Sequence, residues 1–152
     1  MIHKVIAVNK LALFDYKLIQ TAEAGIVLTG FEVKACRLGG VSIRESHIGG
    51  MQDSGELYLF NANIPEYKHA TNEKQEPKRP RKLLLARREI NKFLGQVNRK
   101  GFTIVPIQMY FNERGKIKIE IALAQGKNVV DKRETIKQRE WDREKHRVLK
   151  HS

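Results

Sequence analysis

The feature that most constrains this fold is a pair of neighbouring segments in which every second residue is apolar. These positions are Val105, Ile107, Met109 and Phe111 in segment 103–111, and Ile117, Ile119, Ile121 and Leu123 in segment 116–123. Successive side chains of a strand point to opposite faces, so each segment predicts a strand with one apolar face. The residues between them, Asn112 to Gly115, suit a tight connection, and together the two strands predict an antiparallel hairpin.

Weaker patterns predict the remaining elements. Short strands are expected over 14–19, 41–48 and 56–60, and helices over 22–38 and 81–94. A long, proline-containing loop is expected over 65–82. Several short strands with embedded helices predict a mainly β fold, namely a small closed barrel of five or six strands of the oligonucleotide-binding (OB) kind.

The positive charge is unevenly distributed along the chain. The 152 residues carry 29 Lys+Arg and 17 Asp+Glu, a net charge of +12. Residues 1–67 are close to neutral, whereas 68–100 carry +8 and 126–152 carry +4. Such an excess favours a polyanionic partner, nucleic acid above all, although a charged face that only keeps the protein soluble is the alternative.

The sequence divides near Gly126 into a domain over 1–125 and a basic tail over 126–152. The tail has no continuous apolar stripe, so we expect it to be disordered when free and to become helical on a polyanion. In a helix, Arg139, Arg143 and Arg147 would align on one side for phosphate contacts, and Trp141 could stack on a base or sugar. The alternative is a frayed, solvated terminus.

Other functional classes find little support in the sequence. The N-terminus lacks the pattern of a secretory signal, no apolar run approaches the length of a membrane span, and a single cysteine fits the cytoplasm. No phosphate-binding glycine motif and no metal-ligand spacing is present, so we expect no cofactor and no metal. A hydrolase that uses Cys36 and His47 remains as an alternative, but nothing else argues for an enzyme.

Eight motifs occur in an order that is familiar from a known family. They are Asn9-Lys10, the segment 23–30 (EAGIVLTG), the segment 32–34 (EVK), the segment 55–59 (GELYL), the segment 79–85 (RPRKLLL), Arg88-Glu89, the segment 110–115 (YFNERG) and the segment 131–134 (DKRE). Together they resemble the small protein B family, the bacterial tmRNA-binding (SsrA-binding) proteins. The resemblance covers residues 7 to 150.

The resemblance implies a tmRNA-binding protein of trans-translation, the process that rescues stalled ribosomes and tags their nascent peptides for degradation. An OB-like barrel would bind the tRNA-like domain of tmRNA, support its aminoacylation and deliver it, with elongation factor Tu, to the ribosome. The tail would then sense the empty mRNA channel beside the decoding centre. The family implies no catalytic residue, and we expect a monomer.

The resemblance also suggests site residues, position by position. On the barrel these are Asn9, Glu23, Leu84, Lys118 and Gly126, to which charge adds Arg81 and Lys82 as phosphate contacts. In the tail the residues expected to meet the ribosome are Lys127, Asp131, Lys132, Arg133, Lys137, Arg139, Trp141, Arg143 and Arg147.

This sequence departs from the family pattern at a few positions. Leu13 and Phe14 replace a usual arginine and histidine, Ala86 stands where a polar residue is common, and Asn128 replaces a lysine. The resemblance then implies a missing polar contact to RNA or ribosome at Leu13 and Phe14, one hydrogen bond fewer to the RNA at Ala86, and one positive charge fewer at the start of the tail. A generic ribosome-associated structural protein, basic and with a tail, remains the alternative from another functional class.

Overall fold

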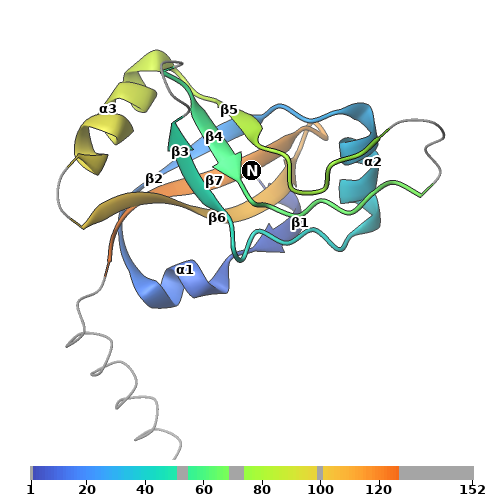
Figure 1. Cartoon of the computed structure of the whole chain (residues 1–152), viewed down its shortest axis with the longest axis horizontal. Coiled ribbons are helices and arrows are strands. Elements are labelled where there is room, and N and C mark those ends of the chain that lie inside the picture. The colour runs from blue at the N-terminus through green and yellow to red at the C-terminus, as the bar shows by residue number, and fades with distance from the viewer. Residues whose placement is uncertain (1, 51–54, 69–73, 99–100, 127–152) are drawn as a thin grey trace, which may run out of the picture.

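The computed structural model of the chain describes residues 2–50, 55–68, 74–98 and 101–126. Seven strands and three helices follow one another along these residues (Figure 1). They are β1 (Ile2–Val8), α1 (Lys10–Asp15), β2 (Tyr16–Ile26), α2 (Gly30–Leu38), β3 (His47–Gly50), β4 (Leu57–Phe60), β5 (Arg81–Leu84), α3 (Arg87–Val97), β6 (Phe102–Asn112) and β7 (Ile117–Gly126).

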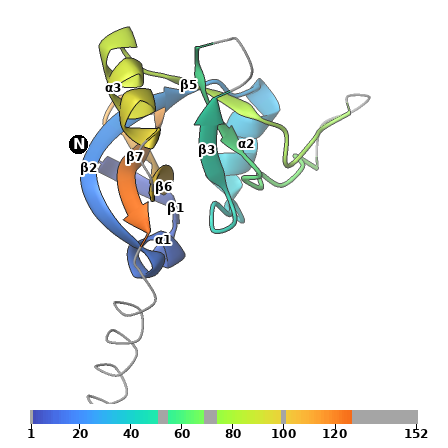
Figure 2. The same cartoon turned by 60° about the vertical axis from the view of Figure 1, so that its left-hand side comes forward.

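The strands form one antiparallel sheet in the order β1-β6-β3-β4-β5-β2-β7, and β7 also pairs with β6. Six of the strands therefore make a ring of pairings, while β1 lies beside the second half of β6. Figure 2 shows β2, β7 and β6 curving together, with β3 to the right of them in this view. This confirms the expectation of a mainly β fold with short helices.

The predicted hairpin is confirmed as β6 and β7, with Tyr110 opposite Lys118 and Phe111 opposite Ile117. The prediction that one face of β6 carries all its alternating apolar residues is wrong. A register shift between Pro106 and Gln108 changes the side to which the strand's residues point. As a result Val105 and Ile107 pack in a different cluster from Met109 and Phe111.

Two hydrophobic clusters hold the sheet. The main cluster fills the inside of the ring and includes Leu57, Leu83, Met109 and Ile119, each fully buried. The second cluster lies on the opposite face of β6 and β7, where Ala12 of α1 covers short side chains. Its other buried members are Val105, Ile107, Ala122 and Ala124.

The helix predicted over 22–38 is wrong in its first part. The residues up to Ile26 continue β2, which pairs with β5 and β7, and α2 begins only at Gly30. Thr29 is the physical reason for this boundary. Its hydroxyl accepts from the Glu32 amide while the Glu32 carboxylate accepts from the Thr29 amide, a reciprocal cap that starts the helix there.

The other predicted boundaries also shift. The helix predicted over 81–94 begins six residues later, because 81–84 pair as β5 with β2 and β4. The strand predicted over 41–48 is reduced to its last two residues plus an isolated bridge between Ser42 and Asn63. The strand predicted over 14–19 starts at Tyr16, and β1 and α1 were not predicted.

None of the helices in the described ranges is long and apolar enough to cross a bilayer.

Candidate nucleic-acid interface

A row of paired residues crosses the outer face of the sheet. Gly25 of β2 lies opposite Leu84 on β5 and opposite Lys118 on β7, and Lys118 in turn lies opposite Tyr110 on β6. Leu84 and Lys118 were both predicted from the resemblance as RNA-facing residues. Strand register thus brings two predicted residues from distant parts of the sequence to one place.

A groove of about 400 Å³ opens along this row. Its walls come from β2, β5, β7, α2 and the turn between β6 and β7. The residues that line it are Gly25, Ile26, Leu28, Val33, Leu84, Gly115, Lys116, Ile117 and Lys118. Leu84 is 52% exposed, so the groove presents an apolar side chain with lysines at its rim.

Gly25 allows the close approach of β2 and β5 at the base of the groove. A Cβ at this position would lie 3.2 Å from the Leu84 Cβ, which is tighter than ordinary van der Waals contact. The missing side chain also leaves open the space between Leu84 and Lys118. The glycine therefore helps to set the width of the groove.

Glu23 lies two residues from Gly25 on the same face of β2 and is exposed. The Tyr110 hydroxyl donates a hydrogen bond to Glu23 Oε2. Glu23 Oε1 has no partner among the residues that the structure describes, so it can accept hydrogen bonds from a ligand. Glu23 also lies directly opposite Glu120 of β7, a like-charge pair that costs stability in the absence of a donor between them.

The two carboxylates affect Tyr110. Burial raises the pKa of the Tyr110 hydroxyl, and its hydrogen bond to Glu23 and the charges of Glu23 and Glu120 raise it further. The hydroxyl therefore stays protonated at physiological pH and remains a donor to Glu23. This donor orients the exposed Glu23 carboxylate through its Oε2 atom.

Lys82 is half-buried on β5, two residues from Leu84 and on the same face, and lies opposite Tyr58. Its neighbour Arg81 has the opposite orientation and is fully buried. The Arg81 guanidinium donates to Glu32 and to the carbonyl oxygens of Ala62 and Pro77. Arg81 is thus part of an internal network that anchors β5, and it presents no exposed atom to a phosphate in this structure.

Two other predicted residues lie away from the groove. Asn9 is 3% exposed and caps α1, since its Oδ1 accepts from the Ala12 amide and its Nδ2 donates to the Pro106 carbonyl at 3.0 Å. Gly126 is exposed at the end of β7 opposite Tyr16, eight residues beyond Lys118. RNA contacts by these two residues stay predictions.

The predicted tail residues fall outside the described part of the chain. They are Lys127, Asp131, Lys132, Arg133, Lys137, Arg139, Trp141, Arg143 and Arg147, and the departure at Asn128 lies there too.

Three residues of this surface were not predicted: Gly25, Tyr110 and Glu120. The sequence does hold a signal for Tyr110 and Glu120. The connection over 112–115 sets the hairpin register, which puts position 110 opposite 118 and on the same face as 120. Gly25 could not be found this way, because its role depends on the pairing of β2 with β5, distant in sequence.

Cys36 does not resemble a nucleophile. The side chain is buried on α2, and burial, with the nearby charge of Glu32, raises the thiol pKa to about 11 despite the opposing effect of Arg81. The thiolate that such chemistry needs is therefore scarce at neutral pH. Within the described ranges, no three His, Cys, Asp or Glu side chains gather where they could hold a metal ion.

Comparison with known proteins shows one family. Residues 6–151 match the family model described as SmpB protein. An SsrA-binding protein of Rhodopseudomonas palustris (strain BisB18) is 54% identical over 147 residues, which cover 97% of this chain and 92% of the relative. An SsrA-binding protein of Rhizobium meliloti (strain 1021) is 48% identical over 149 residues, which cover 98% of this chain and 92% of the relative.

A solved structure is also similar to this chain. It is named "tmRNA-SmpB: a journey to the center of the bacterial ribosome", and its matching chain is 44% identical with a TM-score of 0.62. The match covers 76% of this chain and 80% of that chain. Because a family model spans almost all of the sequence and full-length relatives share about half of its residues, the chain belongs to the SmpB protein family.

Proposed function

We propose that this protein binds tmRNA and acts in trans-translation, without catalysing a reaction itself. The observation that carries the proposal is the family match over residues 6–151 together with relatives named SsrA-binding protein. The groove is consistent with the proposal, because Leu84 of β5 and Lys118 of β7, two residues matched to the family's RNA-facing set, line it on either side of Gly25 of β2, and Glu23 lies beside it.

The groove suits folded RNA in its chemistry. Glu23 Oε1 can accept hydrogen bonds from the amino or imino groups of an exposed base edge, which are the donors that a carboxylate needs. The exposed Leu84 side chain offers an apolar contact to a base or sugar. Lys116 and Lys118 at the rim, and Lys82 two residues from Leu84 on β5, would contact phosphates, which set position rather than sequence preference.

Several finer proposals follow from the family resemblance. The ring of strands would act as a small OB-like barrel over 1–125 that binds the tRNA-like domain, supports its aminoacylation and is delivered with elongation factor Tu. The tail over 126–152 would fold in the mRNA channel of the ribosome and sense that no message is there. The protein would work in the cytoplasm as a monomer.

Replacing Glu23 tests the groove. Glu23→Ala removes the base-edge acceptor, so its affinity for an RNA fragment carrying the tRNA-like domain of tmRNA should fall about five- to tenfold. Glu45→Ala removes an exposed carboxylate from the segment before β3 and is the matched control, with unchanged affinity expected. Equal affinity of both variants and the wild type, measured by fluorescence anisotropy, would remove Glu23 from the site.

A further inference from the structure

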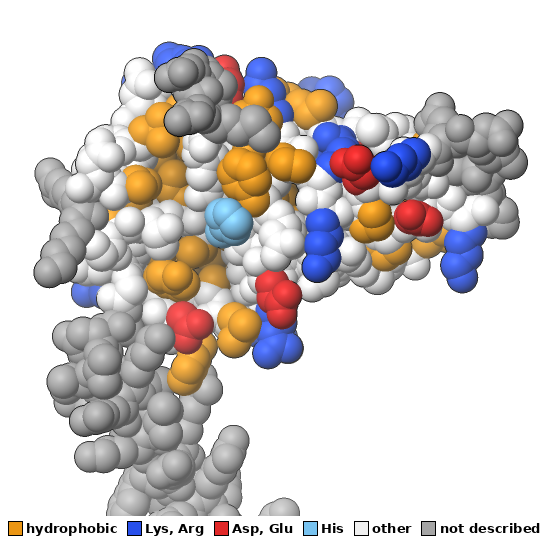
Figure 3. All heavy atoms as spheres, in the orientation of Figure 1, with side chains coloured by type: hydrophobic (Ala, Val, Ile, Leu, Met, Phe, Trp, Pro, Cys, Tyr) orange, Lys and Arg blue, Asp and Glu red, His pale blue; other side chains and the backbone are white. Residues whose placement is uncertain are grey.

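Most of the positive charge of segment 68–100 lies away from the groove. Arg79 and Arg81 are both paired with Glu32. Among the described cations of this segment, Lys82 lies on the same face of β5 as Leu84, which lines the groove. The remaining described cations lie on the loop before β5 and on α3, as the Lys and Arg side chains along the upper edge and toward the α2 end of Figure 3 indicate. The carboxylates of Glu23 and Glu120 lie opposite each other beside the groove, on the same sheet face as Gly25 and Lys118. Most of the positive charge of segment 68–100 is therefore available to another surface.

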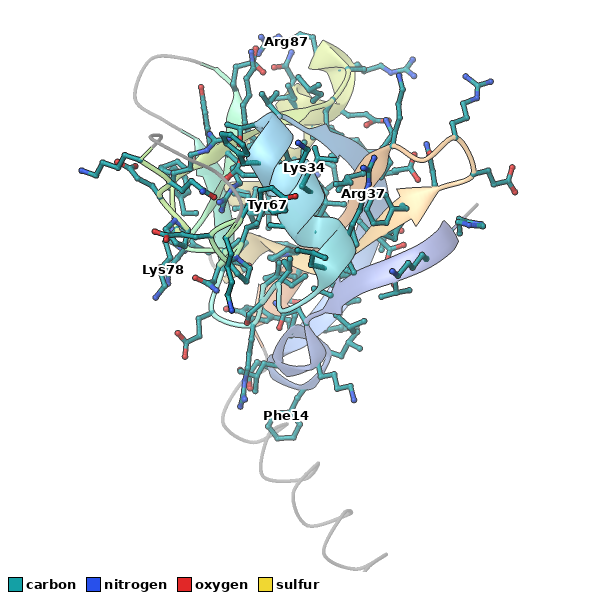
Figure 4. The ribbon with its side chains drawn as sticks, turned by 90° about the vertical axis from the view of Figure 1, so that its right-hand side faces the viewer. Phe14, Lys34, Arg37, Tyr67, Lys78 and Arg87 are labelled. Atoms are coloured by element: carbon teal, nitrogen blue, oxygen red, sulfur yellow. The ribbon has the colours of Figure 1, made fainter. Side chains whose placement is uncertain are left out.

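The exposed side of α2 presents a built arrangement of cations. The rings of Phe31 and Tyr67 stack with centroids 6.1 Å apart, and Lys34 Nζ lies 5.9 Å from the first ring and 5.5 Å from the second. A cation near two ring faces is attracted by both, which restricts the lysine to one place. Figure 4 shows Lys34 and Tyr67 together at α2, with Arg37 and Lys78 to either side.

The loop that carries Tyr67 is tied down in its described residues. Its two arms are joined by the amide and carbonyl of Tyr67, which bond to the Gln75 side chain at 2.7 and 3.1 Å, and by the Ile64 amide bonded to the Pro77 carbonyl. Arg79 fastens the loop to α2 through Glu32, with Nη2 to Oε1 at 2.5 Å. The cations of this loop therefore stand on a rigid support beside α2.

The charges on this surface are not neutralised. We define the α2 surface as Phe31, Lys34, Arg37, Glu66, Tyr67, Lys68, Lys74, Glu76 and Lys78. Its five cations and two carboxylates are all exposed, a surplus of three positive charges. Within the described part of the chain, Lys34, Arg37 and Lys78 form no ion pair.

We propose that the α2 surface is a second RNA-binding site, which takes the phosphate backbone of a double-helical RNA segment while the groove holds another RNA. Fixed cations without carboxylate partners suit phosphates, which are recognised by charge and shape rather than sequence. The centre of a protein–protein interface is depleted of charge, which disfavours an acidic protein as the partner. The site extends the proposed function, since one protein could then bridge two RNA segments.

The test uses the full chain and a blunt RNA duplex of about 20 base pairs with arbitrary sequence. The triple variant Lys34→Gln/Arg37→Gln/Lys78→Gln is compared with Lys4→Gln/Lys10→Gln/Arg88→Gln, which removes three exposed cations from β1, α1 and α3. The first variant should lose about tenfold or more in duplex affinity. The slope of its log affinity against log salt concentration should fall by the equivalent of about three phosphate contacts. The control should change less than about twofold.

A second measurement separates this site from the groove. The α2 triple variant should bind the tRNA-like fragment of tmRNA as the wild type does, and wild type preloaded with that fragment should still bind the duplex. Equal duplex losses in both triple variants, or duplex binding blocked by preloading, would overturn the second site. If the α2 triple variant loses binding to a polyglutamate peptide but keeps its duplex binding, the surface binds an acidic protein. This result would also overturn the proposal of a second RNA-binding site. Circular dichroism of each variant confirms that it is folded.

Discussion

At the scale of single residues, the Glu32 carboxylate accepts hydrogen bonds from three different residues. The donors are the Thr29 amide, Arg79 and Arg81, whose side chain is fully buried. Burial alone would raise the pKa of Glu32, but the hydrogen bonds from Arg79, Thr29 and Arg81 outweigh it and hold the pKa below its usual value. One residue therefore joins the start of α2 to β5.

Replacing Glu32 should destabilise the protein strongly. Glu32→Gln leaves the buried Arg81 guanidinium without a counter-charge, so the free energy of unfolding should fall by about 3 kcal/mol at neutral pH. Urea unfolding measures this, with the exposed Glu66→Gln as a control that should change it by less than about 0.5 kcal/mol.

The pH dependence gives Glu32 a separate signature. The pKa of the Glu32 carboxyl is lower in the folded state than in the unfolded state, so its ionised form stabilises the folded protein at any pH above its pKa in the unfolded state. This stabilisation is lost as the pH falls through the pKa that the carboxyl has in the folded state. The difference between wild type and Glu32→Gln should therefore shrink as the pH drops below about 4.5. A difference that stays constant down to the acid transition would show that the carboxylate charge is not what stabilises this contact.

At the scale of secondary-structure elements, the groove depends on how closely β2 and β5 approach. Their short pairing involves only Gly25 with Leu84 and Ile26 with Leu83. A side chain at position 25 must displace Leu84 or occupy the groove, because its Cβ would lie 3.2 Å from the Leu84 Cβ.

Gly25→Ala should therefore weaken RNA binding. We expect the affinity for the tRNA-like fragment of tmRNA to fall about fivefold, with the free energy of unfolding changed by less than about 1 kcal/mol. Gly95→Ala is the matched control, because a Cβ there meets nothing within 4 Å and no change in affinity is expected. Wild-type affinity in Gly25→Ala would mean that RNA does not use this groove.

The elements differ in how well the sequence predicts them. The alternation of β7 is strong because this strand is paired along nearly its whole length and its larger apolar side chains share the face toward the main cluster, whereas the alternation of β6 hid a register shift between Pro106 and Gln108. The helix prediction over 22–38 extended into β2 because Val27, Phe31 and Leu38 recur at helical spacing, but only the last two lie in α2, and the chain changes element at Thr29. β5 was missed because a four-residue strand has too few positions to show alternation.

The site was predictable only through the resemblance. Glu23, Leu84 and Lys118 were predicted by matched position, and the structure places them on one face of neighbouring strands. Charge alone suggested Arg81 as a phosphate contact, and the sequence could not show that this side chain is buried, because its burial depends on Glu32, 49 positions away. A buried ion pair of this kind has no local sequence pattern.

At the scale of the whole molecule, the charge excess separates into surfaces with different proposed roles. The groove has lysines at its rim and the carboxylates of Glu23 and Glu120 beside it, the α2 surface is basic, and the tail carries +4 over 126–152. Binding of tmRNA is assigned to the described domain, and sensing of the mRNA channel to the tail. These roles should therefore be separable by truncation.

Deletion of residues 131–152 should separate them. We expect the truncated protein to bind the tRNA-like fragment of tmRNA with affinity within about threefold of the full chain, because the groove lies wholly before residue 126. Peptide tagging on stalled ribosomes, measured in a reconstituted translation reaction, should be lost. Tagging at the wild-type level by the truncated protein would contradict the proposed role of the tail.

The central claim is that this chain selects tmRNA through the groove. The most direct measurement is to purify the tagged full chain from bacterial extract and sequence the RNA that accompanies it, beside the variant Glu23→Ala/Lys118→Ala. We expect tmRNA to be the most enriched RNA with the wild type and to be lost with the variant. Enrichment of ribosomal RNA alone, with no preference for tmRNA, would contradict the claim and favour a generic ribosome-associated protein.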